Sequence, residues 1–334
     1  MFYKILVIII SFQSISLCKE SCTSDNNSMK LIIDTDAGGD DAVAIFLLLA
    51  NKNIQIIAIT CVYGNTEEKN VENNVLKILT IANRTDIPVY GGSAKPLLKN
   101  YSRDNFFGND GFGDFQFDKN ITATIDRSKH ASIAIIELSK AYSDDINILT
   151  LGALTNIALA ASLDSNFTQR INKFYVMGSI IDESMQSKIN PNIEFNFGLD
   201  PDSNAIFFNS TVNRKILILP WDVVLKEAIA KKWRTDILGN VNSQVIQYLN
   251  KIEAVALKKT KAWFTSDTII ASILLWPDLV TTFLEAKLSA VNCGPFKGSV
   301  LVESINVESR QKNVEIVRNF KTTIFKKKLL QCLS

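Results

Sequence analysis

The chain has 334 residues, of which 47% are hydrophobic and 21% charged, a composition that is ordinary for a globular protein. Its formal net charge of +2 gives no reason to expect nucleic acid or an anionic membrane as a partner. His130 is the only histidine, and no two cysteines have the Cys-X-X-Cys spacing. A zinc site of the usual kind and a histidine-based catalytic triad are therefore not expected.

The N-terminus has the pattern of a signal peptide. A short basic start precedes a mostly apolar run over residues 5–17, and small residues suit cleavage after Cys18. We therefore expect a signal peptide at residues 1–18, a single domain over residues 19–334, and secretion of the mature protein. Six Asn-X-Ser/Thr sequons, which indicate a glycoprotein, begin at Asn26, Asn83, Asn100, Asn120, Asn166 and Asn209.

Four cysteines remain once the signal peptide is removed, and an oxidising compartment permits disulfide bonds among them. Cys61 lies in an apolar segment and is expected to be a buried thiol. Cys293 is left with two alternatives, since it can pair with Cys332 or with Cys22.

The most informative stretch of the chain covers residues 31–50. A short apolar run ends in Asp34-Thr35-Asp36, two glycines follow, and Asp40-Asp41 open an apolar run of helical length. This order predicts a buried strand, a tight turn and a helix with an acidic first turn. Four carboxylates within eight residues repel each other if they are buried together, and a hard cation such as calcium or magnesium is the simplest remedy. The alternative is a solvated acidic turn, which the glycine pair and the second Asp pair disfavour.

The rest of the chain alternates apolar strands with helices, which predicts βαβ units and an α/β fold with a mostly parallel, Rossmann-like open sheet flanked by helices. Expected strands cover residues 54–62, 87–90, 146–151, 173–176 and 215–219. Expected helices cover residues 67–83, 131–142, 201–209 and 266–275, with a further apolar helix after Asn156. Residues 228–265 are expected to be charged and helical, and residues 279–320 to form strands around Gly294 and Gly298, before a basic tail.

Residues 93–129 are predicted to form a long loop that is rich in aromatic residues and glycine. Loops of this length in compact domains are usually functional or disordered. The aromatic residues disfavour disorder, so we expect a lid or a wall of a site.

Polar residues follow the expected strand ends, where open α/β sheets bind ligands. These clusters are Asp34 with Asp36, Asn65, Thr155 with Asn156, the stretch after Met177, and Trp221 with Asp222. Here the chain resembles the nucleoside hydrolases, of the inosine-uridine-preferring and purine-specific types. Residues 34–42, Asp-Thr-Asp-Ala-Gly-Gly-Asp-Asp-Ala, look like the signature of that family. Further matches occur in the family's order at residues 62–65, 108–113, 151–156, 177–178, 194–196 and 266–267.

The resemblance implies a nucleoside hydrolase fold and a calcium-dependent N-ribohydrolase that cleaves a nucleoside to free base and ribose. It also implies a homo-oligomer, either a dimer or a tetramer. The metal ligands would be Asp36, Asp41 and Asp267, with the backbone carbonyl of Leu151. Asp36 would also act as the general base for the attacking water. The residues that match sugar contacts are Asp40, Asn65, Met177, Glu194 and Asn196, with Glu194 directed towards O5′.

These residue types suit the chemistry, because departure of the base leaves oxocarbenium-like positive charge on the ribose, which carboxylates stabilise. The chain departs from the family at two histidine positions, which are Ser266 and Phe107 here, and Ser179 replaces a glycine. An aromatic pocket formed by Phe106, Phe107, Trp263 and Phe264 is expected to stack a purine instead. We therefore expect purine nucleosides such as inosine as substrates, and together with secretion the pattern resembles extracellular purine nucleosidases of animals.

Two alternatives remain open. The missing histidines permit a catalytically impaired, secreted protein that binds nucleoside or calcium. A phosphatase of the haloacid dehalogenase type would use Asp34 as its nucleophile. That family normally has Thr or Val two residues after the second Asp, where this chain has Gly38.

Overall fold

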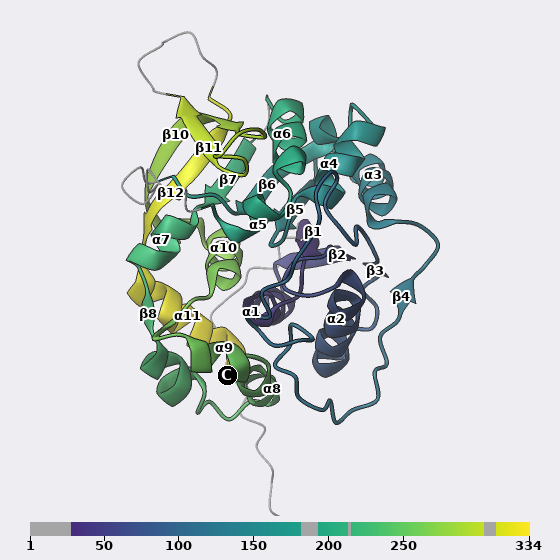
Figure 1. Ribbon diagram of the computed structural model, residues 1–334. Helices are drawn as coiled ribbons and strands as arrows, with labels where there is room; N and C mark the ends of the chain where they lie inside the picture. The colour runs from purple at the N-terminus through teal and green to yellow at the C-terminus, as the bar shows by residue number, and fades with distance from the viewer. Residues whose placement is uncertain (1–27, 182–192, 213–214, 304–311) are drawn as a thin grey trace, which may run out of the picture.

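The computed structural model describes residues 28–181, 193–212, 215–303 and 312–334. The expected signal peptide, Cys22 and the sequon at Asn26 lie outside the described residues. Within them, ten strands form one sheet, and every neighbouring pair is parallel except the two pairs that β10 makes. The prediction of a mostly parallel α/β fold is therefore confirmed (Figure 1).

In their spatial order across the sheet, the strands are β11 (Val300–Glu303), β10 (Val280–Ala290), β12 (Val314–Phe320), β7 (Lys215–Leu219), β6 (Ile171–Met177), β5 (Ile146–Thr150), β1 (Met29–Thr35), β2 (Ile54–Cys61), β3 (Val89–Tyr90) and β4 (Ile125–Asp126). The α-helices are α1 (Gly39–Leu49), α2 (Glu68–Ala82), α3 (Ala131–Ala141), α4 (Thr155–Leu163), α5 (Phe195–Leu199), α6 (Pro201–Ser210), α7 (Trp221–Lys226), α8 (Gln244–Ile252), α9 (Ala254–Lys259), α10 (Ser266–Leu275) and α11 (Thr322–Leu333). A π-helix covers Trp233–Leu238, short 3₁₀ helices cover Thr168–Arg170 and Pro277–Leu279, and a small separate sheet pairs β8 (Ile229–Ala230) with β9 (Ala262–Trp263).

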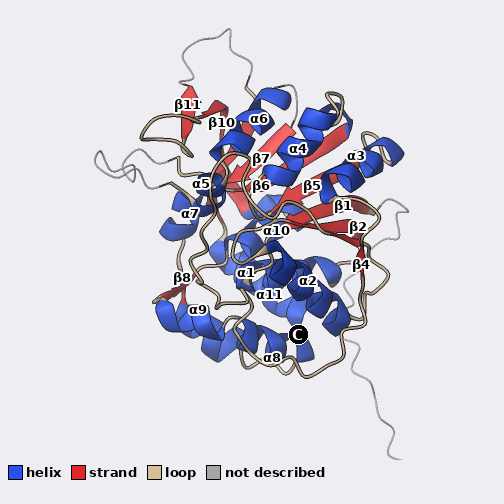
Figure 2. Cartoon of the chain, turned by 45° about the vertical axis from the view of Figure 1, so that its right-hand side comes forward, coloured by secondary structure: helices blue, strands red, loops and turns tan. Residues whose placement is uncertain are grey.

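Helices cover both faces of the sheet. The helices α3, α4 and α6 lie on one face, and α1, α2, α10 and α11 lie on the other (Figure 2). Side chains alternate across a strand, so Leu31 and Ile33 of β1 belong to the core under α1, whereas Ile32 belongs to the core under α3 and α4. Burial on both faces explains why β1 reads as a continuous apolar run in the sequence.

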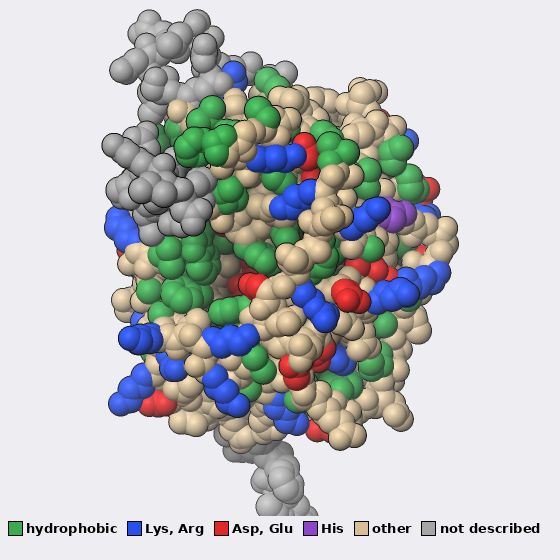
Figure 3. Space-filling view, in the orientation of Figure 1, with side chains coloured by type: hydrophobic (Ala, Val, Ile, Leu, Met, Phe, Trp, Pro, Cys, Tyr) green, Lys and Arg blue, Asp and Glu red, His purple; other side chains and the backbone are tan. Residues whose placement is uncertain are grey.

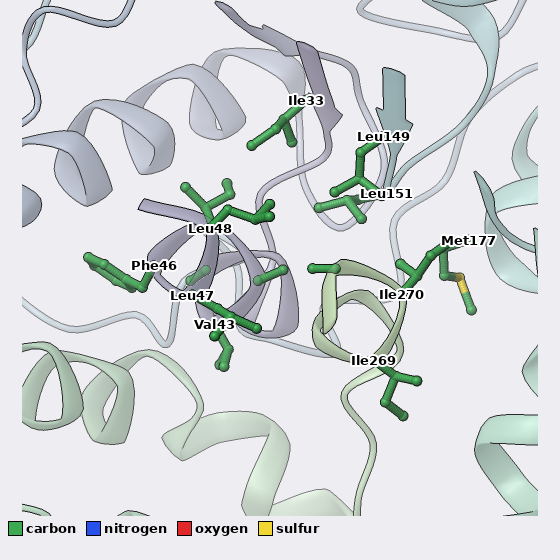
Figure 4. Close-up of a cluster of buried hydrophobic side chains, with 14 of the residues drawn as sticks. Ile33, Val43, Phe46, Leu47, Leu48, Leu149, Leu151, Met177, Ile269 and Ile270 are labelled. Carbon is green, nitrogen blue, oxygen red and sulfur yellow. The ribbon is translucent and has the colours of Figure 1, made fainter. Parts of the chain in front are cut away.

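The central core joins the strand ends to the two helices that carry the acidic residues. Side chains of β1 and β5 point towards α1 and α10, with Ile33 and Leu149 facing Leu48 and Leu47 (Figure 4). Ile270 of α10 packs in the same cluster. This packing holds the N-terminal ends of α1 and α10 next to each other below the sheet edge.

Two expectations for the C-terminal third need correction. The predicted basic tail is the helix α11, because Phe325, Leu329 and Leu333 recur at a spacing of four and pack into the core. The region of residues 228–265 is not wholly helical, since it also contains β8 and β9. None of the helices in the described ranges is long and apolar enough to cross a bilayer.

The cysteines differ in their surroundings. Cys61 is buried and not disulfide-bonded, as predicted. Cys293 is exposed after β10 and Cys332 is half-buried on α11, and the structure does not join these two residues in a disulfide bond.

A buried ion pair connects the π-helix to the segment between α8 and α9. Arg234 is 0% exposed and donates from Nε to Glu253 Oε2 at 2.7 Å and from Nη1 to Asn250 Oδ1 at 2.7 Å. The indole N–H of Trp263 donates to the other oxygen of Glu253. The Glu253 carboxylate therefore joins three elements that are separate in the sequence.

Glu253→Gln should destabilise the protein strongly, because it leaves the Arg234 cation buried without its counter-charge. Removing one partner of a buried pair costs about 3–5 kcal/mol. Urea unfolding of both proteins measures this difference. The control is Asp118→Asn, which removes the half-exposed bridge between Lys251 and Asp118 and should change the free energy of unfolding by less than about 1 kcal/mol. Equal effects of the two substitutions would contradict the structural role of the buried pair.

Candidate active site

A pocket of about 750 Å³ lies at the carboxyl ends of the parallel strands. In the space-filling view it is a hollow near the middle of the molecule, with acidic side chains inside and hydrophobic side chains beside it (Figure 3). We call the acidic, amide and serine side chains at the strand ends and helix starts, together with Leu151 and Met177, the floor: Asp40, Asn65, Leu151, Met177, Glu194, Asn196, Ser266 and Asp267. We call the other lining residues the wall: Asp104, Phe106, Phe107, Ile180, Ile193, Phe195, Trp221, Leu225, Thr260 and Phe264.

Eight of the ten site residues predicted from the sequence line this pocket, seven in the floor and Phe107 in the wall. The other two, Asp36 and Asp41, are 1% and 0% exposed and lie beneath it. Residues more than 200 positions apart in the sequence meet here: Asp40 and Ser266 are hydrogen-bonded, because α1 and α10 pack against each other in the same core. The predicted roles of the individual residues stay predictions.

Three buried carboxylates form a group with the spacing of a metal site. Asp40, Asp41 and Asp267 each offer an oxygen, and these oxygens lie within 4.8 Å of one another. Asp36, predicted as a metal ligand, is not part of this group of three. The carbonyl oxygen of Leu151, the other predicted ligand, accepts a hydrogen bond from Asn196 Nδ2 at 2.6 Å.

The carboxylates of this site are hard to ionise in the protein alone. Burial raises the pKa of Asp36 and Asp267 well above the ordinary value, and repulsion from Asp40 and Asp41 raises both further. Burial and the charge of Asp41 raise the pKa of Asp40 to about 7, and burial also raises the pKa of Asp41. Positive charge among these oxygens would favour their ionised forms, so the donor set fits a hard divalent cation.

Asp36 also fits such a centre, because its two oxygens differ in their surroundings. Oδ2 accepts a hydrogen bond from the backbone N–H of Asn65 at 2.7 Å. Oδ1 is buried and has no hydrogen-bond partner in the protein. An oxygen buried in this way is costly unless a cation, a water molecule or a substrate group meets it.

The turn before α1 orients Asp41. Thr35 Oγ1 donates to Asp41 Oδ1 at 2.5 Å, and the N–H of Gly38 donates to Oδ2 at 2.9 Å. Ala37 between them has a φ of +39°, which brings its N–H to Thr35 Oγ1. The Asp-Thr-Asp-Ala-Gly-Gly sequence therefore builds a turn in which the third residue of α1 points back to the helix start.

Two floor residues are held by hydrogen bonds from neighbouring elements. Ser266 Oγ donates to Asp40 Oδ2 at 3.0 Å. Glu194 caps α5 by accepting hydrogen bonds from the N–H groups of Asn196 at 2.8 Å and Phe197 at 2.9 Å. It also accepts one from the N–H of Ser179 at 3.1 Å, and burial raises its pKa to about 7.

The aromatic side chains of the wall differ from the prediction at one position. Phe106, Phe107 and Phe264 line the pocket, but Trp263 is 2% exposed and bonded to Glu253 behind it. Trp263 is the last residue of β9 and Phe264 directly follows that strand, so the two rings are neighbours in the sequence, but only that of Phe264 lines the pocket. Trp221 replaces it in the wall, with its ring 5.4 Å from that of Phe264. The only signal for Trp221 in the sequence was its place directly after a strand.

The phosphatase alternative does not fit this geometry. Asp34, its required nucleophile, is 0% exposed and does not line the pocket. Its Oδ1 accepts hydrogen bonds from Thr60 Oγ1 at 2.6 Å and Asn156 Nδ2 at 2.8 Å. Asp34 therefore lies in the sheet behind the site, where no substrate reaches it.

An open α/β sheet with buried carboxylates beneath a pocket at its strand ends defines an enzyme that acts on small molecules. Comparison with known proteins gives the family: the model of the inosine-uridine preferring nucleoside hydrolases matches residues 31–327. The chain belongs to this family, and it is a nucleoside hydrolase.

Individual relatives agree with this assignment. The chain is 32% identical over 226 residues to a probable uridine nucleosidase 2 of Arabidopsis thaliana, covering 67% of this chain and 68% of the relative. It is 27% identical to the pyrimidine-specific ribonucleoside hydrolase RihA of Shigella flexneri, covering 87% and 93% of the two chains. Among solved structures, a plant nucleoside hydrolase superposes with a TM-score of 0.79 at 25% identity, covering 92% of this chain and 99% of that one.

Gly64→Ala should abolish most of the activity, because a Cβ at position 64 would lie 2.0 Å from Asp36 Oδ2 and displace that carboxylate. Small misplacements of a reacting group cost about 100-fold in rate. The test is kcat on inosine, together with the melting temperature to exclude unfolding. Gly294→Ala is the control for backbone strain alone, since its Cβ would meet nothing within 4 Å but its φ is +70°; it should lower the melting temperature and leave kcat unchanged. A Gly64→Ala protein with normal kcat would show that the position of Asp36 does not matter.

Proposed function

We propose that this protein is a secreted, calcium-dependent nucleosidase that hydrolyses purine nucleosides such as inosine to free base and ribose. The observation that carries the proposal is the division of one pocket into a floor of carboxylates and amides and a wall that is mostly aromatic and aliphatic. The hydroxyl groups of a ribose can hydrogen-bond to the floor, and the two apolar faces of a purine can pack against the wall.

The cation we propose is calcium. The proposed ligands are the carboxylates of Asp36, Asp41 and Asp267 with the carbonyl of Leu151, and Asp40 lies among them. All of these donors are oxygens, which hard cations prefer, and the irregular set suits calcium better than magnesium with its strict octahedral geometry. When bound, the cation would lower the pKa of a water molecule and orient the sugar diol.

In the proposed reaction the Asp36 carboxylate accepts a proton from the attacking water at Oδ1, the oxygen that no protein group occupies. The water oxygen bonds to C1′ as the N-glycosidic bond breaks, and the electron pair of that bond leaves with the base. The proton taken up by Asp36 then passes through solvent to the base, which restores the carboxylate. Asp40, Asn65 and Asn196 hold the sugar hydroxyls, Met177 packs against the ring and Glu194 lies towards O5′, as the family resemblance implies. The negative charge of the floor stabilises the positive charge that develops on the ribose.

The preference for purines rests on the wall. Phe106, Phe107, Phe195, Trp221 and Phe264 give it five aromatic rings, and stacking of a base on an aromatic side chain is worth about 1–3 kcal/mol. Two-ring bases offer more surface for this contact than pyrimidines. Relatives named for uridine or pyrimidine make pyrimidine nucleosides the competing substrates, so the assay includes both classes.

Secretion is supported by the surface of the protein as well as by the N-terminal sequence. Five sequon asparagines lie in the described residues, and all five are exposed: Asn83, Asn100, Asn120, Asn166 and Asn209. A glycan can be attached only at such accessible positions. We also propose a homo-oligomer, which light scattering of the purified protein tests.

Removal of calcium should abolish turnover. Purified protein is treated with a chelator and assayed on inosine, guanosine, adenosine and uridine, with free base separated from nucleoside. Activity should return on addition of calcium. Full activity without metal, or rescue by zinc but not calcium, would refute the proposed centre. Binding of nucleoside without hydrolysis in the calcium-loaded protein would support the catalytically impaired alternative.

Asp36→Asn should lower kcat far more than it raises KM, because the amide keeps the size and one oxygen but removes the base. General-base assistance is commonly worth about 10²–10⁴-fold. Asn65→Ala, which removes a sugar contact but keeps the backbone N–H, should instead raise KM. Steady-state kinetics on inosine separates the two effects. Retention of more than about a tenth of kcat in Asp36→Asn would make the base assignment wrong.

Expression in eukaryotic cells should yield a secreted chain that begins near Lys19 and carries N-glycans. Mass spectrometry before and after glycosidase treatment measures both features. An intact Met1 together with no change in mass would refute secretion through this signal peptide.

A further inference from the structure

The wall of the pocket carries one charged side chain among the residues that the structure describes. Most wall residues are apolar, whereas Asp104 and Thr260 carry hydrogen-bond acceptors. Thr260 Oγ1 donates its hydrogen to the carbonyl of Ala256 at 3.4 Å, so its lone pairs are left for other groups. The polar part of the wall therefore offers mainly acceptors, and the Asp104 carboxylate is the strongest of them.

Asp104 is oriented by its own segment. The N–H of Phe106 donates to Asp104 Oδ1 at 2.8 Å, which fixes the carboxylate relative to the backbone. Oδ1 keeps further lone-pair capacity, as does Oδ2. The side chain can accept two more hydrogen bonds without losing this contact.

The segment that carries Asp104 is held in place from both sides. Lys259 at the end of α9 donates to the carbonyl oxygens of Asn105 at 2.5 Å and Phe106 at 3.1 Å, and its ammonium lies 5.9 Å from the Phe106 ring centre. On the other side, Arg103 donates to the carbonyl of Asn109 at 3.3 Å and lies 3.6 Å from Glu67. A carboxylate placed by an anchored segment costs little ordering entropy when it meets a ligand.

We propose that Asp104 selects among purine nucleosides by accepting hydrogen bonds from N–H groups on the edge of the base. Guanine offers the N1–H and the 2-amino group side by side, which suits the two oxygens of a carboxylate. Hypoxanthine offers only the N1–H, and adenine presents a lone pair at N1 that the carboxylate repels. The inference rests on the proposed function, and it predicts the order guanosine, inosine, adenosine for kcat/KM.

These three nucleosides share the ribose and the two-ring base, so the floor and the aromatic stacking treat them alike. A change in their relative kcat/KM when Asp104 is substituted therefore reports on a polar group that faces the edge of the base, because the chemistry of each leaving base stays the same. A site that hydrogen-bonds an N–H of its substrate rejects analogues that lack this group.

The test is kcat/KM on guanosine, inosine and adenosine for the calcium-loaded wild type and for Asp104→Asn. The amide keeps an oxygen for the Phe106 N–H, but it can turn a donor towards N1 of adenine. The ratio of guanosine to adenosine should fall about tenfold or more, which is the effect of one hydrogen bond to a charged group. Guanosine should become worse and adenosine equal or better, a reciprocal change that loss of stability does not produce.

Asp118→Asn is the matched control, because Asp118 lies on the same long loop but contacts Tyr248 and Lys251 outside the pocket. It should leave the ratio unchanged. An unchanged ratio in Asp104→Asn, or a wild type that prefers adenosine, overturns the role of Asp104 while the nucleosidase proposal stands. Absence of cleavage of all three nucleosides and of uridine by the wild type overturns the proposed function, and this inference with it.

Discussion

The carboxylates at the start of α1 and the carboxylate of Asp267 at the start of α10 lie together, almost completely buried, at the base of the pocket. Burial raises the pKa of each, and for Asp36, Asp40 and Asp267 their mutual repulsion adds to this effect. A protein gains no stability from such an arrangement by itself. The rest of the structure compensates for this cost, through the core that holds α1 against α10 and through a donor set that suits a cation.

The first strand, turn and helix offset part of the cost of burying these carboxylates through hydrogen bonds of their own and of the neighbouring strand end. The N–H groups of Gly38 and Asn65 and the hydroxyl of Thr35 donate to the buried carboxylates, so part of the lost hydration is replaced by fixed dipoles. Gly64 lacks the side chain that would occupy the space of Asp36. These hydrogen bonds occupy only Oδ2 of Asp36, and Oδ1 has no hydrogen-bond partner in the protein. A general base needs such an oxygen, because it must be able to accept a proton.

The pocket divides its tasks between floor and wall. Strand ends and helix starts form the floor, and these rigid elements suit groups that must be placed accurately for chemistry. The wall comes from the long loop, the residues after β6, the start of α5, α7 and the segment between α9 and α10, which meet only in the folded chain. Lys259 links two of these segments, and the Glu253 carboxylate supports them from behind through Arg234 and Trp263. The wall can therefore differ in shape and polarity without a change in the floor.

The sequence by itself determined the parallel sheet and the floor, because the apolar run, the glycine pair and the acidic turn act within twenty residues and parallel strands end at one edge. It also predicted part of the wall, namely the long loop with Phe106 and Phe107, and Phe264, but not the whole of it. Trp263 and Phe264 are neighbours in the sequence, but only the fold places Trp263 against Glu253 and Phe264 in the pocket. Trp221 and Asp104 carry no periodic pattern, and the segment of α11 predicts only a basic tail. These features depend on contacts between segments that are far apart in the sequence. A local pattern of residues cannot predict them, because it holds no information about which distant segments will pack together.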